Sequence, residues 1–278
     1  MKATLIITIR YRFVKFSIVA NTKQENIKKI LKRMIGFVDD FELDSASAKF
    51  LGLSGVEIRN LTGDVIVSLG GDGTILHILS QINKPILGIN CGGVGIHKEL
   101  EPEDDIFAAI DNLISGKYFE EKLHRIDTFI NDLKVGTAVN EIVLHSSRVA
   151  KIQGFEISTN GQLIDRFRGD GVIIAAPTGS TSYSMSVGAP IIYPTMKSNL
   201  IVPMAAYKLG SRPLILPSNY EISANITGHP EAVMVIDGKE EIHIKKGDNI
   251  QFKASKSPAS LIRFNRNFFD RLRNKLRL

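Results

Sequence analysis

The sequence has a single cysteine, Cys91, among its 278 residues. One cysteine cannot form a disulfide within the chain, which indicates a reducing compartment, and we expect its thiol to be a small packing group rather than a nucleophile. The apolar stretch Ala3–Ile9 is too short to span a bilayer and is followed by Arg10, Arg12 and Lys15. No small-residue cleavage site follows it, so a signal peptide is not expected. These features predict a cytoplasmic protein.

Two common nucleotide-binding motifs are also missing. There is no Gly-x-x-x-x-Gly-Lys-Ser/Thr segment, which excludes a P-loop enzyme. Gly93 and Gly95 begin a Gly-x-Gly pattern, but Lys98 stands where the dinucleotide fingerprint of dehydrogenases requires a third glycine. Internal repeats, low-complexity tracts and a Pro/Ser-rich linker are absent as well. We therefore expect closely packed domains.

The composition is that of a globular protein, with 44% apolar and 23% charged residues. The formal net charge of +6 favours anionic partners, whether nucleotides, nucleic acid or membrane surfaces. Much of this excess lies in the last sixteen residues, where Phe268, Leu272 and Leu276 form an apolar stripe at helical spacing. We expect a C-terminal helix that docks back on the protein, in preference to a membrane or nucleic-acid arm.

The distribution of apolar residues predicts an α/β domain over residues 1–100 and a β-rich domain over residues 101–278. In the first, buried strands at 64–69 and 85–89 alternate with helices, one of them at 45–51, which favours a parallel sheet flanked by helices. In the second, a helix at 106–114 is followed by short β-branched segments separated by turn signals, which favours layered antiparallel sheets. The hairpin turns are expected at Asn131-Asp132, Asn160-Gly161, Asp237-Gly238 and Lys246-Gly247-Asp248.

The most informative motif is Gly70-Gly71-Asp72-Gly73-Thr74, directly after a buried strand and before a helix. Glycines allow positive φ and close approach of the backbone, and amides at a helix start bind phosphate oxygens. A carboxylate repels phosphate, so Asp72 would suit a hydroxyl group or a metal ion. The alternative is an ordinary strand-to-helix turn with Asp72 as a cap.

Two further segments carry unusual polar side chains. Asn140-Glu141 is expected in the middle of a β-strand, where polar side chains are costly to bury without partners such as a ligand amide or ribose. An exposed bulge is the alternative. The second segment runs from Gly169-Asp170-Gly171 through a strand to Pro177-Thr178-Gly179-Ser180-Thr181-Ser182-Tyr183. Its hydroxyl groups can donate to phosphate, ribose or an adenine edge.

Together these segments resemble the NAD kinase family in order and spacing, over roughly residues 15–265. Ser186, Gly188, the segment Leu87-Gly88-Ile89-Asn90 and the segment Ile236-Asp237-Gly238 fit as well. The Gly-Gly-Asp-Gly-Thr motif is shared with phosphofructokinases and with diacylglycerol and sphingosine kinases, whereas the Thr-Gly-Ser-Thr-x-Tyr block is much more specific to NAD kinases. The chain departs from the family in having Val94-Gly95-Ile96 for Leu-Gly-Phe, and Ala176-Pro177 for Thr-Pro.

The resemblance implies transfer of a phosphoryl group to the adenosine 2′-hydroxyl of NAD, forming NADP. It implies ATP or polyphosphate as donor, Mg²⁺ carried with ATP, an active site between an α/β and a β-rich domain, and a homodimer or homotetramer. Asp72 matches the catalytic aspartate. The substrate-binding positions that the resemblance implies are Gly70, Gly71, Gly73, Thr74, Asn140, Glu141, Arg168, Asp170, Thr178, Thr181, Ser182, Tyr183 and Ser186.

Three other functions are consistent with parts of the sequence. A lipid kinase of the diacylglycerol or sphingosine type would use the basic tail as a membrane anchor, but the Asn140-Glu141 pair and the segment 170–183 argue against it. A non-enzymatic NADP(H) sensor would retain the pocket, although every catalytic position is intact. A nucleic-acid-binding protein fits the positive charge, but no basic and aromatic motif supports it. We therefore expect neither nucleic acid nor membrane as a partner.

Overall fold

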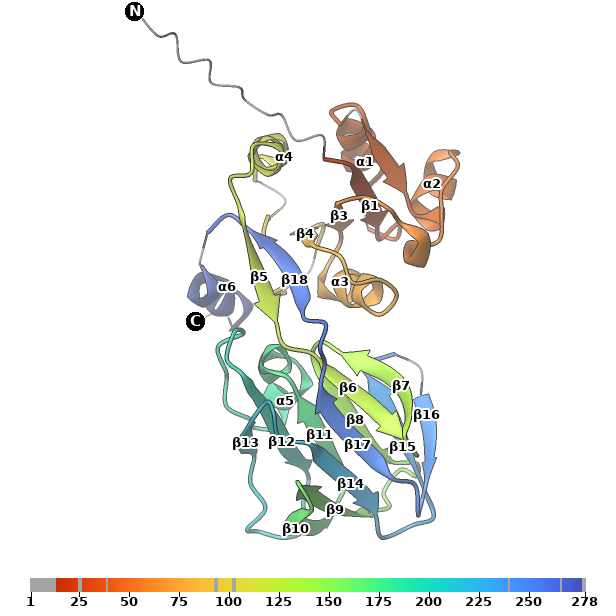
Figure 1. Ribbon diagram of the computed structural model, residues 1–278, viewed down its shortest axis with the longest axis vertical. Helices are drawn as coiled ribbons and strands as arrows, with labels where there is room; N and C mark the ends of the chain where they lie inside the picture. The colour runs from red at the N-terminus through yellow and green to blue at the C-terminus, as the bar shows by residue number, and fades with distance from the viewer. Residues whose placement is uncertain are drawn as a thin grey trace, which may run out of the picture. The chain divides into compact units, whose positions relative to one another are not determined.

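The computed structural model describes residues 14–24, 27–38, 40–92, 95–101, 104–239, 241–265 and 267–276. The apolar N-terminal stretch and the Gly93-Val94 pair lie outside these residues. The chain divides into two compact units, one formed by residues 1–121 and 260–278 and the other by residues 122–259 (Figure 1).

The first unit is built on a six-stranded sheet in the order β2-β1-β3-β4-β18-β5. The pairs β1–β2, β1–β3, β3–β4 and β4–β18 are parallel. Strands β1, β3 and β4 are buried throughout, as expected of parallel strands covered on both faces. The strands are Phe16–Ala20 (β1), Phe41–Leu43 (β2), Val65–Leu69 (β3), Ile86–Ile89 (β4), Phe119–Leu123 (β5) and Ala259–Arg263 (β18).

Two helices of this unit begin at aspartate capping residues. Asp44 accepts hydrogen bonds from the amides of Ala46 and Ser47, and Asp105 caps the fourth helix in the same way. The first helix buries Ile27, Leu31 and Met34, as its spacing predicts. The helices are Ile27–Ile35 (α1), Ser45–Leu51 (α2), Asp72–Leu79 (α3), Ile106–Ile114 (α4) and Phe268–Leu276 (α6), with a 3₁₀ turn at Ile58–Asn60 (η1).

The division of the chain differs from the predicted boundary near residue 100. The helix α4 packs its buried residues into the core of the first unit, and β5 extends its sheet. The last residues also return to this unit, because β18 pairs with β4 and α6 follows it. The sequence shows no break after α4 because the chain continues directly into the first sheet.

The second unit contains two six-stranded sheets, in the orders β10-β9-β14-β17-β6-β7 and β13-β12-β11-β8-β15-β16. Their pairings are antiparallel, which confirms the predicted class. The first sheet consists of Ile126–Ile130 (β6), Leu133–Ala138 (β7), Gln153–Thr159 (β9), Gln162–Gly169 (β10), Ile222–Ile226 (β14) and Ile250–Ala254 (β17). The second consists of Glu141–Ser146 (β8), Gly171–Ala175 (β11), Ser198–Met204 (β12), Leu214–Pro217 (β13), Glu231–Ile236 (β15) and Glu241–Lys245 (β16).

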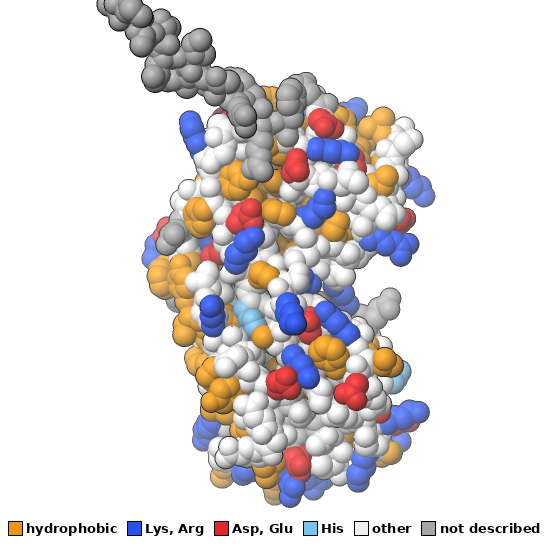
Figure 2. Space-filling view, in the orientation of Figure 1, with side chains coloured by type: hydrophobic (Ala, Val, Ile, Leu, Met, Phe, Trp, Pro, Cys, Tyr) orange, Lys and Arg blue, Asp and Glu red, His pale blue; other side chains and the backbone are white. Residues whose placement is uncertain are grey.

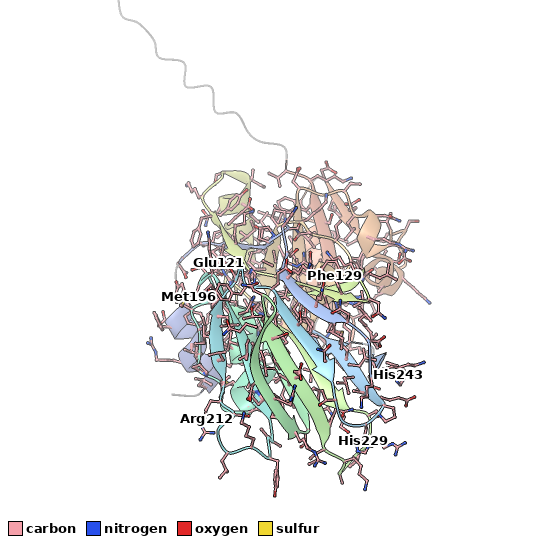
Figure 3. The ribbon with its side chains drawn as sticks, turned by 60° about the horizontal axis from the view of Figure 1, so that its bottom comes forward. Glu121, Phe129, Met196, Arg212, His229 and His243 are labelled. Carbon is pink, nitrogen blue, oxygen red and sulfur yellow. The ribbon has the colours of Figure 1, made fainter. Side chains whose placement is uncertain are left out.

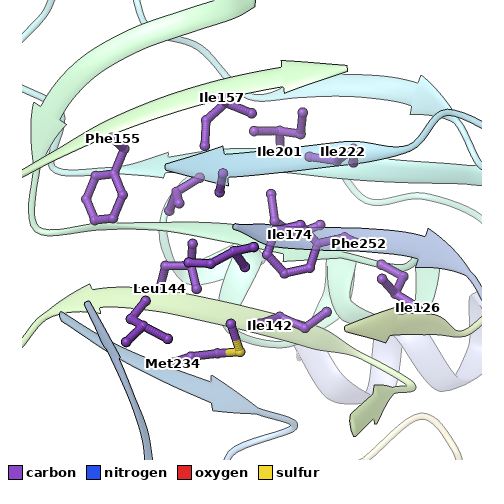
Figure 4. Packing of buried hydrophobic residues seen from close by; sticks show 14 of the residues in the cluster. Ile126, Ile142, Leu144, Phe155, Ile157, Ile174, Ile201, Ile222, Met234 and Phe252 are labelled. Atoms are coloured by element: carbon purple, nitrogen blue, oxygen red, sulfur yellow. The ribbon is translucent and has the colours of Figure 1, made fainter. Parts of the chain in front are cut away.

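One apolar core joins these two sheets. It interleaves Phe155 and Phe252 from one sheet with Leu144, Ile174 and Met234 from the other, all fully buried (Figure 4). The predicted hairpin turns are present, because Asn131-Asp132, Asn160-Gly161 and Asp237-Gly238 each have positive φ at both positions and Gly247 has φ of 101°. A 3₁₀ turn at Pro177–Thr181 (η2) and a short helix at Tyr183–Ser186 (α5) follow β11.

The charged side chains are dispersed over the face of the molecule that Figure 2 shows. On the face shown in Figure 2, Lys and Arg side chains lie among Asp, Glu and apolar side chains rather than in one patch. Within the described part of the chain, no helix combines the length and the apolar character needed to cross a membrane.

Candidate functional site

The glycine-rich turn joins the carboxyl end of β3 to α3. Gly71 is the N-cap of the helix, and Asp72 is its first residue. None of Gly70, Gly71 and Gly73 has positive φ, so the turn does not use the conformational freedom that glycine allows. Glycine is required at position 70 by packing instead, since an added Cβ would lie 2.3 Å from Thr74 Oγ1. Beside Gly73 there is open space, which leaves its backbone accessible to a ligand.

The carboxylate of Asp72 is held by the loop that follows β4. Ile96 donates its amide to Oδ2 at 2.8 Å, and His97 donates its amide to Oδ1 at 3.1 Å. The loop lies so close that a Cβ at Gly95 would be 2.3 Å from Oδ1. The Asp72 side chain therefore does not cap its own helix, as an ordinary strand-to-helix turn would require. Each carboxylate oxygen keeps a lone pair for a further donor.

A cavity of about 470 Å³ lies beside this turn. It is lined by Gly71, Gly73 and Thr74 of the glycine turn and by Asn21, Lys23 and Gln24, which follow the end of β1. The first turn of α3 has amides without partners inside the helix, which favours an anion here. Lys23 was missed in the sequence, where it looks like one of many surface lysines. Its place directly after a buried strand of a parallel sheet is the signal that could have found it.

In the second unit, Asn140 and Glu141 lie where β7 ends and β8 begins. Both residues are buried, at 6% and 7% exposure. The mid-strand prediction is wrong for Asn140, because Val139 and Asn140 form a bend between the strands. The reason is Asp237, whose carboxylate accepts the amides of residues 139, 140 and 141 at 2.8, 2.8 and 3.1 Å. The Asp237 carboxylate thus provides the hydrogen-bond acceptors that a neighbouring strand would otherwise provide.

The hydroxyl-rich segment packs directly against this bend. Thr178 Oγ1 donates to the carbonyl of Val139, and Thr181 Oγ1 donates to the carbonyl of Thr178 at 3.1 Å. Both threonines are buried, so their hydroxyl groups support the local backbone. Ser182 Oγ is half-exposed and donates to Glu141 Oε1 at 3.1 Å. The structure therefore brings Asn140-Glu141, the 178–182 segment and Asp237 together.

Glu141 and Tyr183 line a second cavity, of about 520 Å³, on the outer side of β8 and β15. Its floor is apolar, with Val143, Val233 and Val235 between the two polar ends of the cavity. The Tyr183 ring is 43% exposed. An apolar floor with few polar groups is the usual character of a small-molecule site. Ser186, in the same short helix, is exposed.

Arg168 and Asp170 are not part of this cluster. They adjoin the start of β11, whereas Thr178 follows its end. In the sheet Gly171 is paired with His145 and Ala175 with Glu141, so the two ends of β11 are roughly 13 Å apart. Arg168 is exposed, and Asp170 is half-buried with its amide bound to the carbonyl of Met204.

Burial shapes the charge of the Asp237 region. It raises the pKa of the Asp237 carboxyl, against the lowering effect of the three amides and of Lys239. Burial also lowers the pKa of Lys239 and of Arg125, and the carboxylate of Asp237 opposes both changes. Elsewhere, burial raises the pKa of the Cys91 thiol to about 11, as befits a packing residue. No group of three or more His, Cys, Asp and Glu side chains in the described ranges is placed to hold a metal ion.

Two family models together match most of the chain. The ATP-NAD kinase N-terminal domain matches residues 4–118, and the ATP-NAD kinase C-terminal domain matches residues 139–264. The chain is 36% identical over 234 residues to the NAD kinase of Thermoplasma volcanium, covering 84% of this chain and 86% of the other. It is 38% identical over 257 residues to the NAD kinase of Methanosarcina mazei, covering 90% and 88%.

Two solved structures are also similar to this chain. The crystal structure of an NAD kinase from Archaeoglobus fulgidus in complex with ATP superposes with a TM-score of 0.77 and 27% identity, covering 95% of this chain and 98% of that one. The crystal structure of yeast NADH kinase complexed with NADH has a TM-score of 0.85, at 22% identity, and covers 95% and 87%. The second likeness shows the fold alone.

Proposed function

This chain belongs to the NAD kinase family and is a kinase, and we propose that it transfers a phosphoryl group from ATP or polyphosphate to the adenosine 2′-hydroxyl of NAD. One observation carries the chemical part of this proposal. The carboxylate of Asp72 is fixed by two backbone amides at the first turn of α3, beside a cavity that the glycine turn lines. A fixed carboxylate next to an anion site is what phosphoryl transfer to an alcohol requires.

The donor binds in the cavity at the end of β1 and β3. Its terminal phosphate lies against the amides around Gly71 and Gly73, and the start of α3 favours the negative charge. Thr74, the next residue of the turn, also lines this cavity. Lys23, which also lines the cavity, supplies a positive charge. Mg²⁺ enters with the donor, because in phosphoryl transfer this ion is held largely by substrate phosphates and one or two carboxylates.

Asp72 is the proposed catalytic residue. It accepts a hydrogen bond from the 2′-hydroxyl with the lone pairs that the amides of Ile96 and His97 leave free. Transfer through a loose transition state releases the hydroxyl proton late, so alignment of the oxygen with phosphorus matters more than basicity. The hydrogen bonds from these two amides restrict rotation of the Asp72 side chain. Less conformational freedom is therefore lost when the hydroxyl group is aligned for transfer.

NAD is the proposed ligand of the second unit. Asn140 and Glu141 hold the ribose, and Ser182 fixes Glu141 Oε1 for this purpose. The cavity beside Tyr183 accepts a planar ring against its apolar floor. Thr178 and Thr181 act through the backbone of residues 139 and 178, and Ser186, in the helix that begins at Tyr183, is exposed.

We propose that Arg168 and Asp170 reach an NAD site as part of a homodimer or homotetramer. Within one copy they adjoin the far end of β11 from Ala175 and Glu141. The exposed Tyr207 and Leu209, at 84% and 88%, lie just after β12 and offer apolar area for such an assembly. Analytical ultracentrifugation measures the mass of the assembly, and a monomer at assay concentration would contradict the proposal.

The function is tested by initial rates with each donor and acceptor. Purified protein is incubated with Mg²⁺, with ATP or polyphosphate as donor and with NAD or NADH as acceptor, and NADP is measured with an NADP-specific dehydrogenase. Formation of NADP with at least one donor is expected. Absence of product under all conditions, with intact binding of NADP, would favour a sensor instead. Phosphorylation of diacylglycerol or sphingosine in mixed vesicles would favour a lipid kinase.

A further inference from the structure

Four charged side chains form a buried network in the first unit. Glu99 is 1% exposed, Arg263 3%, and Arg271 and Glu121 9% each. They come from the loop after β4, from β18, from α6 and from β5, and the Glu121 side chain is labelled in Figure 3. Two guanidinium groups balance two carboxylates, so the network carries no net charge. The mechanism proposed above assigns it no part.

Arg263 is the centre of the network. Its Nε donates to Glu121 at 2.8 Å, and its Nη1 lies within hydrogen-bonding distance of Glu99 at 3.2 Å and of the carbonyls of His97 and Lys98 at 3.0 and 3.2 Å. Glu99 also accepts Nη1 of Arg271 at 3.2 Å. A guanidinium fork is the side chain that can hold a carboxylate and backbone carbonyls in one fixed geometry.

The backbone of His97 connects this network to Asp72. Its amide donates to Asp72 Oδ1 at 3.1 Å, and its carbonyl accepts from Arg263 at 3.0 Å. One residue is thus fixed at both ends, by the carboxylate on one side and by the guanidinium on the other. The preceding residue, Ile96, donates to Asp72 Oδ2.

Stability alone is a poor explanation for such a network. Desolvation of buried charges offsets most of their attraction, and apolar side chains of equal volume often stabilise a core as well or better. Apolar side chains cannot hold the two loop carbonyls, however. The feature that only the charged arrangement provides is a fixed position for the loop at residues 97–98.

We propose that Arg263 is a positioning residue for phosphoryl transfer, which fixes the carboxylate of Asp72 through the backbone of His97. The inference rests on the proposed role of Asp72 in the transfer reaction. Arg263 lines neither of the two cavities assigned to the substrates, so its loss should alter the alignment of the transfer step rather than the affinity for substrates. Its effect should therefore fall on kcat and not on KM.

The experiment replaces Arg263 by lysine in the full-length chain. A lysine keeps the charge but cannot reach Glu121, Glu99 and both carbonyls together. We expect Arg263→Lys to lower kcat about 10- to 100-fold, the loss typical of a small misplacement. The KM values for NAD and donor should stay within about twofold of the wild-type values. In hydrogen–deuterium exchange, the amides of residues 95–101 should exchange faster than in the wild type.

Arg271→Lys is the matched control. Arg271 donates to the same Glu99 oxygen, but its second hydrogen bond goes to Asn267 in the segment before α6. We expect comparable loss of thermal stability in this variant, with kcat and exchange of residues 95–101 close to the wild-type values. Equal losses of kcat in the two variants, or wild-type kcat and exchange in Arg263→Lys, would overturn the inference.

Two further measurements separate the possible failures. If Arg263→Lys does not fold, Glu121→Gln is used instead, because it weakens the hydrogen bond that Arg263 Nε donates to residue 121. This variant should also lower kcat, by a smaller factor. In an Asp72→Asn background, Arg263→Lys should cause no further loss of kcat, because both changes act on one carboxylate. A fully additive loss contradicts the inference. A wild-type enzyme that forms no NADP contradicts the proposed function instead, while the exchange experiment still tests the loop.

Discussion

Asp237 holds the backbone of Asn140, because its Oδ1 accepts a hydrogen bond from the Asn140 amide at 2.8 Å. Asp237 itself lies in a hairpin turn 97 residues further along the chain. The same carboxylate accepts the amides on either side, and the amide of Asp237 itself donates to the carbonyl of Glu141 at 2.9 Å. The bend at residues 139–140 therefore depends on a turn that belongs to another pair of strands.

Asp237→Asn should weaken the binding of NAD. An asparagine side chain has one oxygen acceptor and one NH₂ donor group. At least one of the three backbone amides would therefore face the NH₂ group instead of a carboxylate oxygen. We expect the KM for NAD to rise about tenfold, which corresponds to the loss of one hydrogen bond to a charged group. Asp248→Asn is the control, because Asp248 also accepts a backbone amide, from Lys245, in another hairpin turn. Equal KM values in both variants would contradict the role of Asp237.

Asp72→Asn should abolish most of the turnover. The amide cannot accept the hydroxyl proton and places a donor against one of the two loop amides. We expect kcat to fall about 10²- to 10⁴-fold, while the Kd of NAD measured by calorimetry stays near that of the wild type. Asp104→Asn serves as control, since Asp104 accepts the amide of Glu101 at 2.6 Å elsewhere in the unit. Near-normal turnover in Asp72→Asn would refute the catalytic assignment.

Lys23→Ala should raise the KM for the donor and leave the KM for NAD unchanged. Lys23 lines the cavity at the glycine turn, where the proposed donor carries several negative charges. We expect a change of about tenfold, which should shrink at high salt because the interaction is partly exposed. Lys28→Ala is the comparison, because the Lys28 ammonium lies over the Phe50 ring, 5.6 Å from its centroid. A rise in the KM for NAD alone would contradict the assignment of this cavity to the donor.

Glu42 should make the first unit sensitive to acid. Burial alone would raise the pKa of its carboxyl, but hydrogen bonds from Ser17, Gly63 and Thr62 lower it to about 2, from an ordinary value of 4.5. Because the folded state has the lower pKa, the stabilisation is complete above pH 4.5 and is lost as pH falls toward 2.

Glu42→Gln tests this dependence on pH. We expect it to cost about 1.5–3 kcal/mol near neutral pH, where the charged acceptor is lost. The difference from the wild type should shrink in urea denaturation at about pH 3 compared with about pH 6. Glu156→Gln, which removes a carboxylate paired with Arg166 on β9 and β10, provides an exposed comparison. A difference that grows toward acid pH would contradict the assignment.

Local signals in the sequence predicted the elements well. The bounds of α2 and α4 agree with those expected from the apolar spacing, and both helices have an aspartate at the cap. The hairpin turns followed from Asn and Asp before Gly or in pairs, since these residues accept positive φ. These features depend on neighbours in the chain, and a single sequence contains that information.

Features that depend on distant pairing were not predictable in this way. The parallel pairing of β18 with β4 joins residues 261 and 86, and no local pattern encodes it. The bend at Asn140 depends on Asp237, which by itself looks like a turn residue. Arg271, in the basic C-terminal segment, is buried against Glu99, whereas Leu272 of the predicted apolar stripe is only partly buried.

The position of β18 has a consequence for synthesis of the protein. This strand lies inside the sheet of the first unit, between β4 and β5, although it is made after the whole second unit. Until residues 259–263 are added, the sheet has an unfilled place between β4 and β5, and Glu99 lacks both of its arginine partners. The first unit therefore completes its sheet only after the whole second unit has been made.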